Sequence, residues 1–225
     1  MRVVAYHTGG PYTQEAELLV ASLEKLKIDH HVENVGAATD WDHAVSLKPI
    51  FIYRMREMYT GPLVSVDVDA FFHSDPSAYF DGLDTDFGAH WFQGPSGGYD
   101  KTRNDDWMLS GTMFWGDTKE ARELLKTWSL VNAAKQAVGH WAGGGQANLR
   151  SIVESQLKMG MGWLRVTRLP GEYCYVYDKP WAYPEGTVPC IEHTIASREN
   201  RGKSKGRVHR GRQDRIAVLR KEVGL

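Results

Sequence analysis

Apolar and polar positions follow one another in the first part of the chain in a way that predicts alternating strands and helices. The apolar run RVVAY, residues 2–6, predicts a buried strand, and the Gly and Pro of HTGGPY predict a loop after it. Apolar residues at helical spacing over residues 14–27 predict a helix, and residues 28–35 a second strand. A further helix is expected to begin at Pro49, because proline suits a first helical turn. The run PLVSVDVDAFF, residues 62–72, predicts a third strand.

The second half of the chain continues the alternation. Asp117, with Glu120 three residues later, is typical of a helix start, and residues 146–157 carry apolar positions at helical spacing. Further strands are expected at residues 87–92, 110–116, 163–169 and 173–178. This order predicts an α/β fold of the Rossmann-like, three-layer kind with a central, mainly parallel sheet.

The chain is long enough for one domain, and its charges are distributed unevenly along it. With 225 residues, 42% of them hydrophobic, the chain can bury one sizeable core. Residues 198–225 hold ten Lys or Arg against three acidic residues, a net charge of +7, which leaves −8 for residues 1–197. We therefore expect one domain over residues 1–197 and a basic extension over residues 198–225, which is either solvated or in contact with phosphates.

The sequence also bears on where in the cell the protein is expected and on whether its cysteines have a structural role. No apolar stretch is long enough to span a membrane, and the first residues lack the pattern of a signal peptide, so a cytoplasmic protein is expected. Cys174 and Cys190 are the only cysteines, and their spacing indicates neither a zinc site nor a disulfide framework.

Two carboxylates, Asp67 and Asp69, stand at the end of the third predicted strand. Side chains two positions apart in a strand share a face, so both are expected at the crevice where open α/β sheets bind ligands. Carboxylate oxygens suit Mg²⁺ or Mn²⁺, which keep coordination positions open for substrate phosphates. The structural alternative is that one aspartate caps the next turn and the other is solvated.

Two other enzyme classes use a similar pair of aspartates. The two-metal palm of lesion-bypass DNA polymerases carries a stretch close to DVDAFF, but near its N-terminus and beside domains for which 225 residues leave little room. Phosphatases with an aspartate nucleophile place their motif on the first strand and follow it with Gly-Thr. Here two strand-helix units precede the motif and Ala70-Phe71 follows it, which disfavours both classes.

The order of segments over about residues 1–200 resembles that of GT-A glycosyltransferases, in which a D-x-D motif follows the first β-α-β units. AYHTGGPY resembles the family's opening strand and donor loop, LKPIFI a helix start near the nucleotide, and LVSVDVDAFFHSDP the metal strand. LSGTMFWGDTKEARELLKTW resembles the strand that faces sugar and acceptor, with the helix behind it. GGGQANL and PCIEHTIASRENR resemble the late segments that complete the site.

This resemblance implies a metal centre and the residues around it. Asp67, Asp69 and His193 would hold the cation, and a histidine ligand favours Mn²⁺ over Mg²⁺. Each assignment has a structural alternative, such as a buried histidine, a loop threonine, a packed tyrosine or a core tryptophan. The other implied contacts are Lys48 and Arg198 with the diphosphate, Thr8 and Tyr12 with the nucleoside, and Trp107, Ser110 and Gly111 with the sugar and acceptor.

The chain departs from the family where an acidic residue is expected beside the late glutamine, since Gln146 follows three glycines. An inverting enzyme needs a carboxylate to deprotonate the acceptor, and Asp106, beside Asp105, is the candidate, with a solvent-facing pair as the alternative. A retaining enzyme needs no such base, so both stereochemical outcomes stay open. Asp69, Asp106 and Gln146 are thus the candidate catalytic residues.

The resemblance implies a metal-dependent glycosyltransferase with a nucleotide-diphosphate sugar, preferably a UDP-sugar, as donor and a hydroxyl group as acceptor. The basic extension makes a hydroxymethylated base in DNA one acceptor hypothesis, which would require base flipping, and a polysaccharide is the other. Two further functions stay open: a metal-dependent nucleotidyltransferase and a sugar-nucleotide-binding module without catalysis. The loop HTGGPYTQEA has two glycines and no Lys or Arg, which counts against triphosphate binding.

Overall fold

The computed structural model describes residues 1–92, 107–137, 144–158, 162–196 and 207–225. The elements in its first half are β1 (Arg2–His7), α1 (Tyr12–Lys25), β2 (His30–Asn34), α2 (Trp41–Met58), β3 (Leu63–Val66), β4 (Ala70–Phe72), α3 (Ser77–Asp81) and β5 (Phe87–Phe92). The second half contributes β6 (Trp107–Trp115), α4 (Lys119–Ala137), α5 (Gly144–Lys158), β7 (Val166–Arg168), β8 (Tyr175–Val176), β9 (Ile191–His193) and α7 (Arg207–Val223), with short 3-10 helices at Gly171–Tyr173 and Pro180–Ala182.

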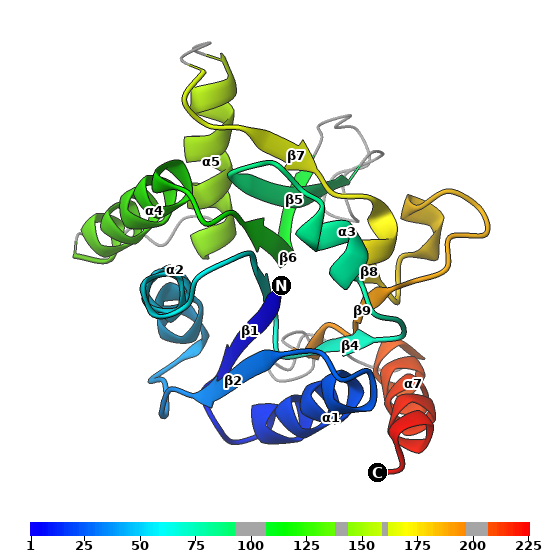
Figure 1. Ribbon diagram of the computed structural model, residues 1–225. Coiled ribbons are helices and arrows are strands. Elements are labelled where there is room, and N and C mark those ends of the chain that lie inside the picture. Colours follow the sequence, from blue (N-terminus) through cyan, green and yellow to red (C-terminus); the bar gives the residue numbers. More distant parts are fainter. Residues whose placement is uncertain (93–106, 138–143, 159–161, 197–206) are drawn as a thin grey trace.

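A six-stranded sheet in the order β2-β1-β3-β6-β5-β7 runs through the middle of the molecule (Figure 1). β1 pairs in parallel with β2 and β3, and β5 pairs in parallel with β7, whereas β6 is antiparallel to both of its neighbours. Five of the six strands therefore point the same way. The predicted α/β fold with a mainly parallel central sheet is confirmed.

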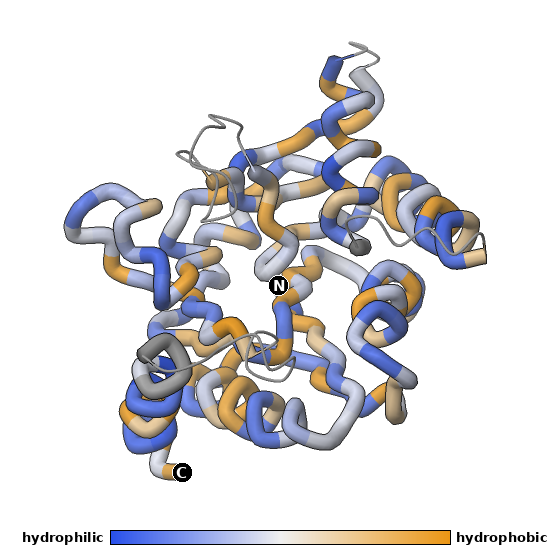
Figure 2. Tube along the Cα trace, turned by 180° about the vertical axis from the view of Figure 1, so that it is seen from behind, coloured by the Kyte–Doolittle hydropathy of each residue, from blue (hydrophilic) through white to orange (hydrophobic). Residues whose placement is uncertain are grey.

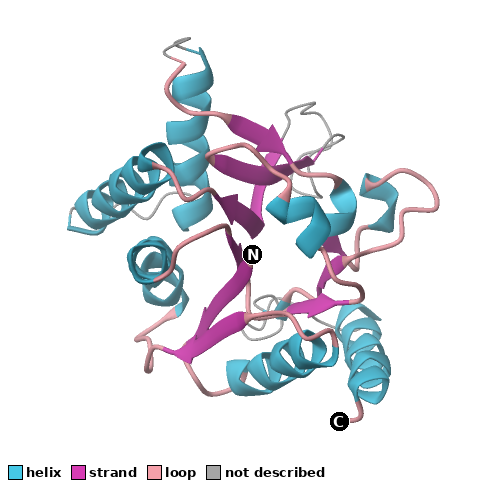
Figure 3. Ribbon diagram, in the orientation of Figure 1, coloured by secondary structure: helices cyan, strands magenta, loops and turns pink. Residues whose placement is uncertain are grey.

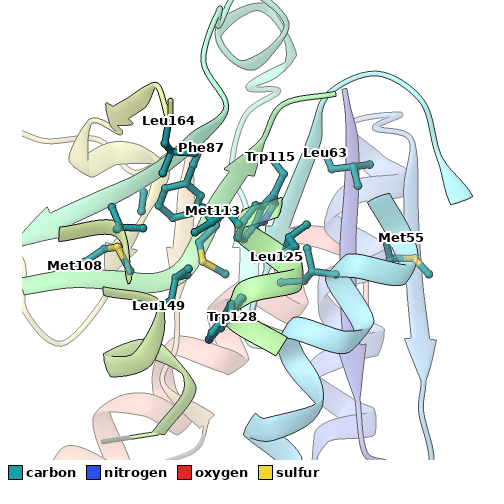
Figure 4. Close-up of a cluster of buried hydrophobic side chains, with 14 of the residues drawn as sticks. Met55, Leu63, Phe87, Met108, Met113, Trp115, Leu125, Trp128, Leu149 and Leu164 are labelled. Atoms are coloured by element: carbon teal, nitrogen blue, oxygen red, sulfur yellow. The ribbon is translucent and has the colours of Figure 1, made fainter. Parts of the chain in front are cut away.

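Helices cover both faces of this sheet, which gives the three predicted layers (Figure 3). Along β1 the side chains alternate between the two sides: Val4 joins one buried cluster, and Val3 and Ala5 join the other. The first cluster lies under α2, α4 and α5 and includes Trp115 and Trp128, whose rings stack 6.1 Å apart (Figure 4). The second cluster lies under α1 and α3. Burial of these apolar side chains is the main stabilising contribution to the fold.

A second, three-stranded sheet in the order β4-β9-β8 stands beside the carboxyl end of β3. β4 pairs with β9 in antiparallel register, so Ala70 lies opposite His193 although the two are far apart in the sequence. The third predicted strand, residues 62–72, is thus divided into β3 and β4, which belong to different sheets. The break falls on residues 67–69.

The helix expected to begin at Pro49 begins earlier. α2 starts at Trp41 and is capped by Asp40, whose side chain accepts from the His43 N–H at 2.7 Å. Pro49 therefore lies inside the helix and, having no N–H, leaves the carbonyl of Val45 without its intrahelical bond. That carbonyl faces the start of α5, where a Cβ on Gly145 would lie 3.5 Å from it, so the glycine allows α2 and α5 to pack closely.

The cap of α4 also differs from the predicted one. Thr118, rather than Asp117, caps the helix, because its Oγ1 accepts from the Ala121 N–H at 3.1 Å. Asp117 instead accepts from the Gly61 N–H at 2.7 Å and pairs with Arg122. The carboxylate thereby ties the loop before β3 to the start of α4.

Residues 207–223, within the predicted basic extension, form helix α7, which packs on α1 (Figure 1). In Figure 2 hydrophilic and hydrophobic residues alternate along this helix. Leu219 is fully buried against Leu18 of α1 and Phe71 of β4. The described part of the extension is therefore a packed helix and not a solvated segment. The expected boundary between residues 197 and 198 lies outside the described residues.

None of the helices that the structure describes combines the length and the apolar content needed to cross a lipid bilayer.

Candidate active site

Asp67 and Asp69 lie in a tight turn that joins β3 to β4. The Ala70 N–H donates to the Asp67 carbonyl at 3.0 Å and closes this turn. The turn, and not the pleat alternation predicted for a continuous strand, directs the two carboxylates to the same place. Their position at the carboxyl end of a central strand is as predicted.

His193 ends β9 and lies next to this turn because β9 pairs with β4. Its Nδ1 is 3.5 Å from Oδ1 of Asp69. One ligand atom from each of Asp67, Asp69 and His193 lies within 4.8 Å of the other two. The structure thus gathers the three residues that the sequence suggested as metal ligands.

The environment of His193 fits a bound divalent cation. The ring is 2% exposed, and its Nε2 lies 2.8 Å from the Thr112 hydroxyl. Its Nδ1 is buried without a hydrogen-bond partner and lies 3.5 Å from Oδ1 of Asp69. Buried polar atoms rarely lack partners, and a hydrogen bond on the far nitrogen is the usual support of a ligating histidine. Two carboxylates and one imidazole suit Mn²⁺ or Mg²⁺.

Asp69 and His193 shift each other's pKa. Burial disfavours the carboxylate of Asp69, but His193, the Ala196 amide and Arg212 outweigh this and lower its pKa. Burial alone would lower the pKa of His193, but Asp69 and Cys174 outweigh it and raise that pKa to about 10. A ligating imidazole has to be neutral, so binding of a metal there would displace a proton from His193.

Lys48 places a positive charge beside the centre. It is buried in α2, and its Nζ donates to Oδ1 of Asp67 at 2.5 Å and to the Ser110 carbonyl at 2.6 Å. The lysine predicted to contact a diphosphate therefore adjoins a candidate metal ligand. A phosphate bound between the cation and this ammonium would meet positive charge on both sides.

Ser110 and Gly111, in the middle of β6, stand behind the centre. The Ser110 N–H and hydroxyl both donate to Oε1 of Gln146, at 3.1 and 2.9 Å, which fixes the amide of the candidate catalytic glutamine. The Gly111 carbonyl accepts from the Asp67 N–H at 2.8 Å. A Cβ on Gly111 would lie only 3.1 Å from the His193 ring. The glycine thus makes room for one candidate ligand and anchors another.

Trp107 begins β6 and is 40% exposed, so the alternative of a core tryptophan is wrong. The guanidinium of Arg150 lies over its ring, 4.8 Å from the ring centre. Thr8 lies in the loop after β1, and Tyr12 begins α1. Burial, followed by the nearby groups of Asp67 and Tyr12, raises the pKa of Tyr6.

Two predicted residues, Asp106 and Arg198, lie outside the described residues, as does Asp105. Thr112 and Thr194, which also adjoin the candidate ligands, escaped the sequence analysis. Thr112 shares a strand face with Ser110 and could have been found from the two-residue period of β6. Thr194 could not, because its role depends on contacts with Asp69 across the fold.

Neither a protein-family model nor a curated protein matches this sequence. Solved structures do match. One is a glycosyltransferase involved in the glycosylation of the major capsid of PBCV-1, with 15% identity over 89% of this chain and 97% of that one and a TM-score of 0.61. Another is the galactosyltransferase LgtC in complex with donor and acceptor sugar analogs, with 12% identity over 86% of each chain and a TM-score of 0.52. The chain therefore has the fold of these glycosyltransferases, the GT-A fold.

Proposed function

We propose that the chain is a metal-dependent glycosyltransferase that moves a sugar from a nucleoside-diphosphate sugar to a hydroxyl group. One observation carries the proposal: ligand atoms of Asp67, Asp69 and His193 come within 4.8 Å of one another at the carboxyl end of β3, with Nδ1 of His193 buried beside Asp69. The likeness to two glycosyltransferases over most of the chain supports the reaction class.

The donor would bind along the carboxyl ends of β1 and β3. Thr8, in the loop after β1, and Tyr12, at the start of α1, would contact the nucleoside, for which we favour uridine. Lys48 would donate to the diphosphate, and Arg198 stays a prediction for the same role. A divalent cation at the Asp67–Asp69–His193 centre would supply positive charge against the charge that develops on the departing nucleoside diphosphate.

The acceptor side would be formed by β6 and the start of α5. Trp107, exposed and covered on one side by Arg150, offers an aromatic face to a sugar ring, and Ser110 holds Gln146 nearby. Asp106 stays the candidate base for an inverting reaction. Since Gln146 cannot take up a proton at neutral pH, its role would be to orient a hydroxyl group.

We favour a saccharide hydroxyl over a DNA base as acceptor. The LgtC structure contains an acceptor sugar analog, which supports this choice. The basic extension, the reason for considering DNA, directs two of its charges inward: Arg212 pairs with Glu15, and Arg215 with Glu192 at 2.5 Å. These pairs reduce the positive charge that α7 can offer to phosphates. Location in the cytoplasm stays a prediction.

Release of nucleoside diphosphate tests the proposal directly. Purified protein would be incubated with a panel of nucleotide sugars under Mn²⁺, Mg²⁺ or chelator, without acceptor, with oligosaccharides, or with hydroxymethylated DNA. We expect metal-dependent release from one donor, stimulated by a saccharide. If hydroxymethylated DNA stimulates the release and saccharides do not, the acceptor is DNA and not a saccharide.

Two other outcomes would show that the proposed function is wrong and would identify a different one. Reaction with nucleoside triphosphates but with no nucleotide sugar would identify a nucleotidyltransferase. Tight binding of a nucleotide sugar without release, in folded and metal-loaded protein, would identify a binding module.

A further inference from the structure

Arg212 of α7 is a buried guanidinium close to the candidate metal centre. It is 5% exposed, and its Nε donates to the Thr194 carbonyl at 3.0 Å. Its Nη2 donates to Glu15 of α1 and contacts the Thr194 hydroxyl at 3.4 Å. A buried charge is costly unless it is paired and hydrogen-bonded, so these contacts define one position for the side chain.

Thr194 in turn contacts Asp69. Its N–H donates to the Asp69 carbonyl at 3.1 Å and its hydroxyl to the same oxygen at 3.3 Å. Two residues later, the Ala196 N–H donates to the Asp69 carboxylate oxygen Oδ2 at 2.7 Å. Residues 194–196 therefore hold both the backbone and the carboxylate of Asp69, and they directly follow His193.

The backbone of this segment is strained. Ile195 has a φ of +59°, in the left-handed region that a β-branched residue rarely adopts. Such a conformation persists only where the surroundings impose it. On one side of Ile195 the Thr194 carbonyl is held by Arg212, and on the other the Ala196 amide is held by Asp69.

We propose that Arg212 is a positioning residue: it holds residues 194–196 in their strained conformation and thereby fixes Asp69 and His193 in the arrangement that binds the cation, an inference that rests on the proposed function. Without Arg212, the Thr194 carbonyl loses its partner and Ile195 can relax to an ordinary φ. The Ala196 amide would then move away from Asp69, and the candidate ligands would lose their fixed separation. Helix α7 is, on this view, part of the metal centre although it supplies no ligand.

Binding of Mn²⁺ to the full-length protein, followed by the paramagnetic resonance signal of the free ion, tests this proposal without measuring turnover. We expect Arg212→Gln to weaken Mn²⁺ binding about tenfold, at the low end of the effect of outer partners on metal sites. The matched control is Leu219→Ala on the same helix, which loosens α7 at its buried contact with Leu18 and Phe71 but leaves Arg212 in place. At a temperature where both variants are folded by circular dichroism, Leu219→Ala should bind Mn²⁺ within about twofold of the unaltered protein.

A second pair of variants covers the case in which Arg212→Gln does not fold. Glu15→Gln keeps Arg212 but weakens its anchor on α1, and should reduce Mn²⁺ affinity about threefold, below the range for direct outer partners. Glu17→Gln, an equal change at an exposed position of the same helix, should leave affinity unchanged.

The outcomes separate this inference from the proposed function. If the unaltered protein binds no Mn²⁺ or Mg²⁺, the proposed function and this inference both fail. If it binds Mn²⁺ and Arg212→Gln binds equally well, only the role of Arg212 is refuted. Equal losses in Arg212→Gln and Leu219→Ala would also refute it, since docking of α7 and not the guanidinium would then be responsible.

Discussion

Replacement of Gly111 by alanine tests whether the candidate metal centre depends on the fit between β6 and the imidazole of His193. A Cβ at this position would lie 3.1 Å from Cε1 and Nε2 of the ring and 3.3 Å from Nδ1. Ordinary van der Waals contact begins at 3.4 Å, so the ring has to move by about 0.3 Å. The ring is buried and bonded to Thr112, and therefore has little room to retreat.

This displacement of the ring should cost little of the free energy of unfolding, but it is large compared with the tolerance of metal–ligand distances. Overpacking of this kind costs about 1–3 kcal/mol of the free energy of unfolding. Ligand distances in metal sites are fixed to about 0.2 Å, so a displacement of about 0.3 Å should weaken Mn²⁺ binding about tenfold. Calorimetric titration with Mn²⁺ and urea unfolding of the same preparation would measure the two effects.

Gly211→Ala is the control for this experiment. Gly211 lies in α7, and a Cβ added there would meet no atom of the described residues within 4 Å. Alanine should therefore raise helix stability by about 0.5–1 kcal/mol and leave metal affinity unchanged. If Gly111→Ala binds Mn²⁺ as tightly as the unaltered protein, the contact between Gly111 and His193 does not control the centre. The same conclusion would follow if both glycine variants lost affinity equally.

Three further outcomes are expected. Asp69→Asn should abolish metal-dependent nucleoside-diphosphate release with little change in the circular dichroism spectrum, because it removes a ligand charge and almost no volume; an active variant would contradict the metal role. Lys48→Met should weaken nucleoside-diphosphate binding by about 1.5–3 kcal/mol in calorimetric titration, because the charged donor beside Asp67 is lost, and unchanged affinity would exclude a phosphate contact. Burial favours the neutral acid of Asp86, but hydrogen bonds from Arg165 outweigh it and lower its pKa, so this pair stabilises the fold above about pH 4 and less as the pH falls further. Asp86→Asn should therefore lower the free energy of unfolding in urea by about 1–3 kcal/mol at neutral pH. If the difference in stability between this variant and the unaltered protein did not shrink in acid, the stabilising role of the ionised Asp86 would be refuted.

The sequence could predict much of the fold because strong apolar periodicity reports which face of each element is buried. β1, α1 and β5 were found in this way, as was the mainly parallel sheet. The start of α2 was missed, since Pro49 is normally read as a helix start, and its cost inside the helix is tolerated through packing against α5. The break of residues 62–72 into two strands was also missed. Asp67 and Asp69 interrupt the run without any glycine or proline to mark a turn.

The candidate metal centre was partly visible in the sequence for a chemical reason. Carboxylates after an apolar strand are conspicuous, and the resemblance to GT-A glycosyltransferases drew attention to His193. Contacts made through the backbone were not visible. No pattern along the chain indicates that the Gly111 carbonyl anchors Asp67, or that Arg212 reaches the Thr194 carbonyl. These pairings arise only when β4, β9 and α7 meet in space.

The pairing of β4 with β9 also sets the order in which the protein can become functional during synthesis. Thr194 lies 125 residues beyond Asp69, so the two halves of the centre leave the ribosome at very different times. A nascent chain that has made β3 and β4 exposes an aspartate pair with no histidine beside it, and Arg212 follows later still. A cation that joins Asp69 to His193 would act as a cross-link that closes a long loop of chain, and would stabilise only molecules synthesised through β9. Metal loading would in this way distinguish chains that contain β9 from chains truncated before it.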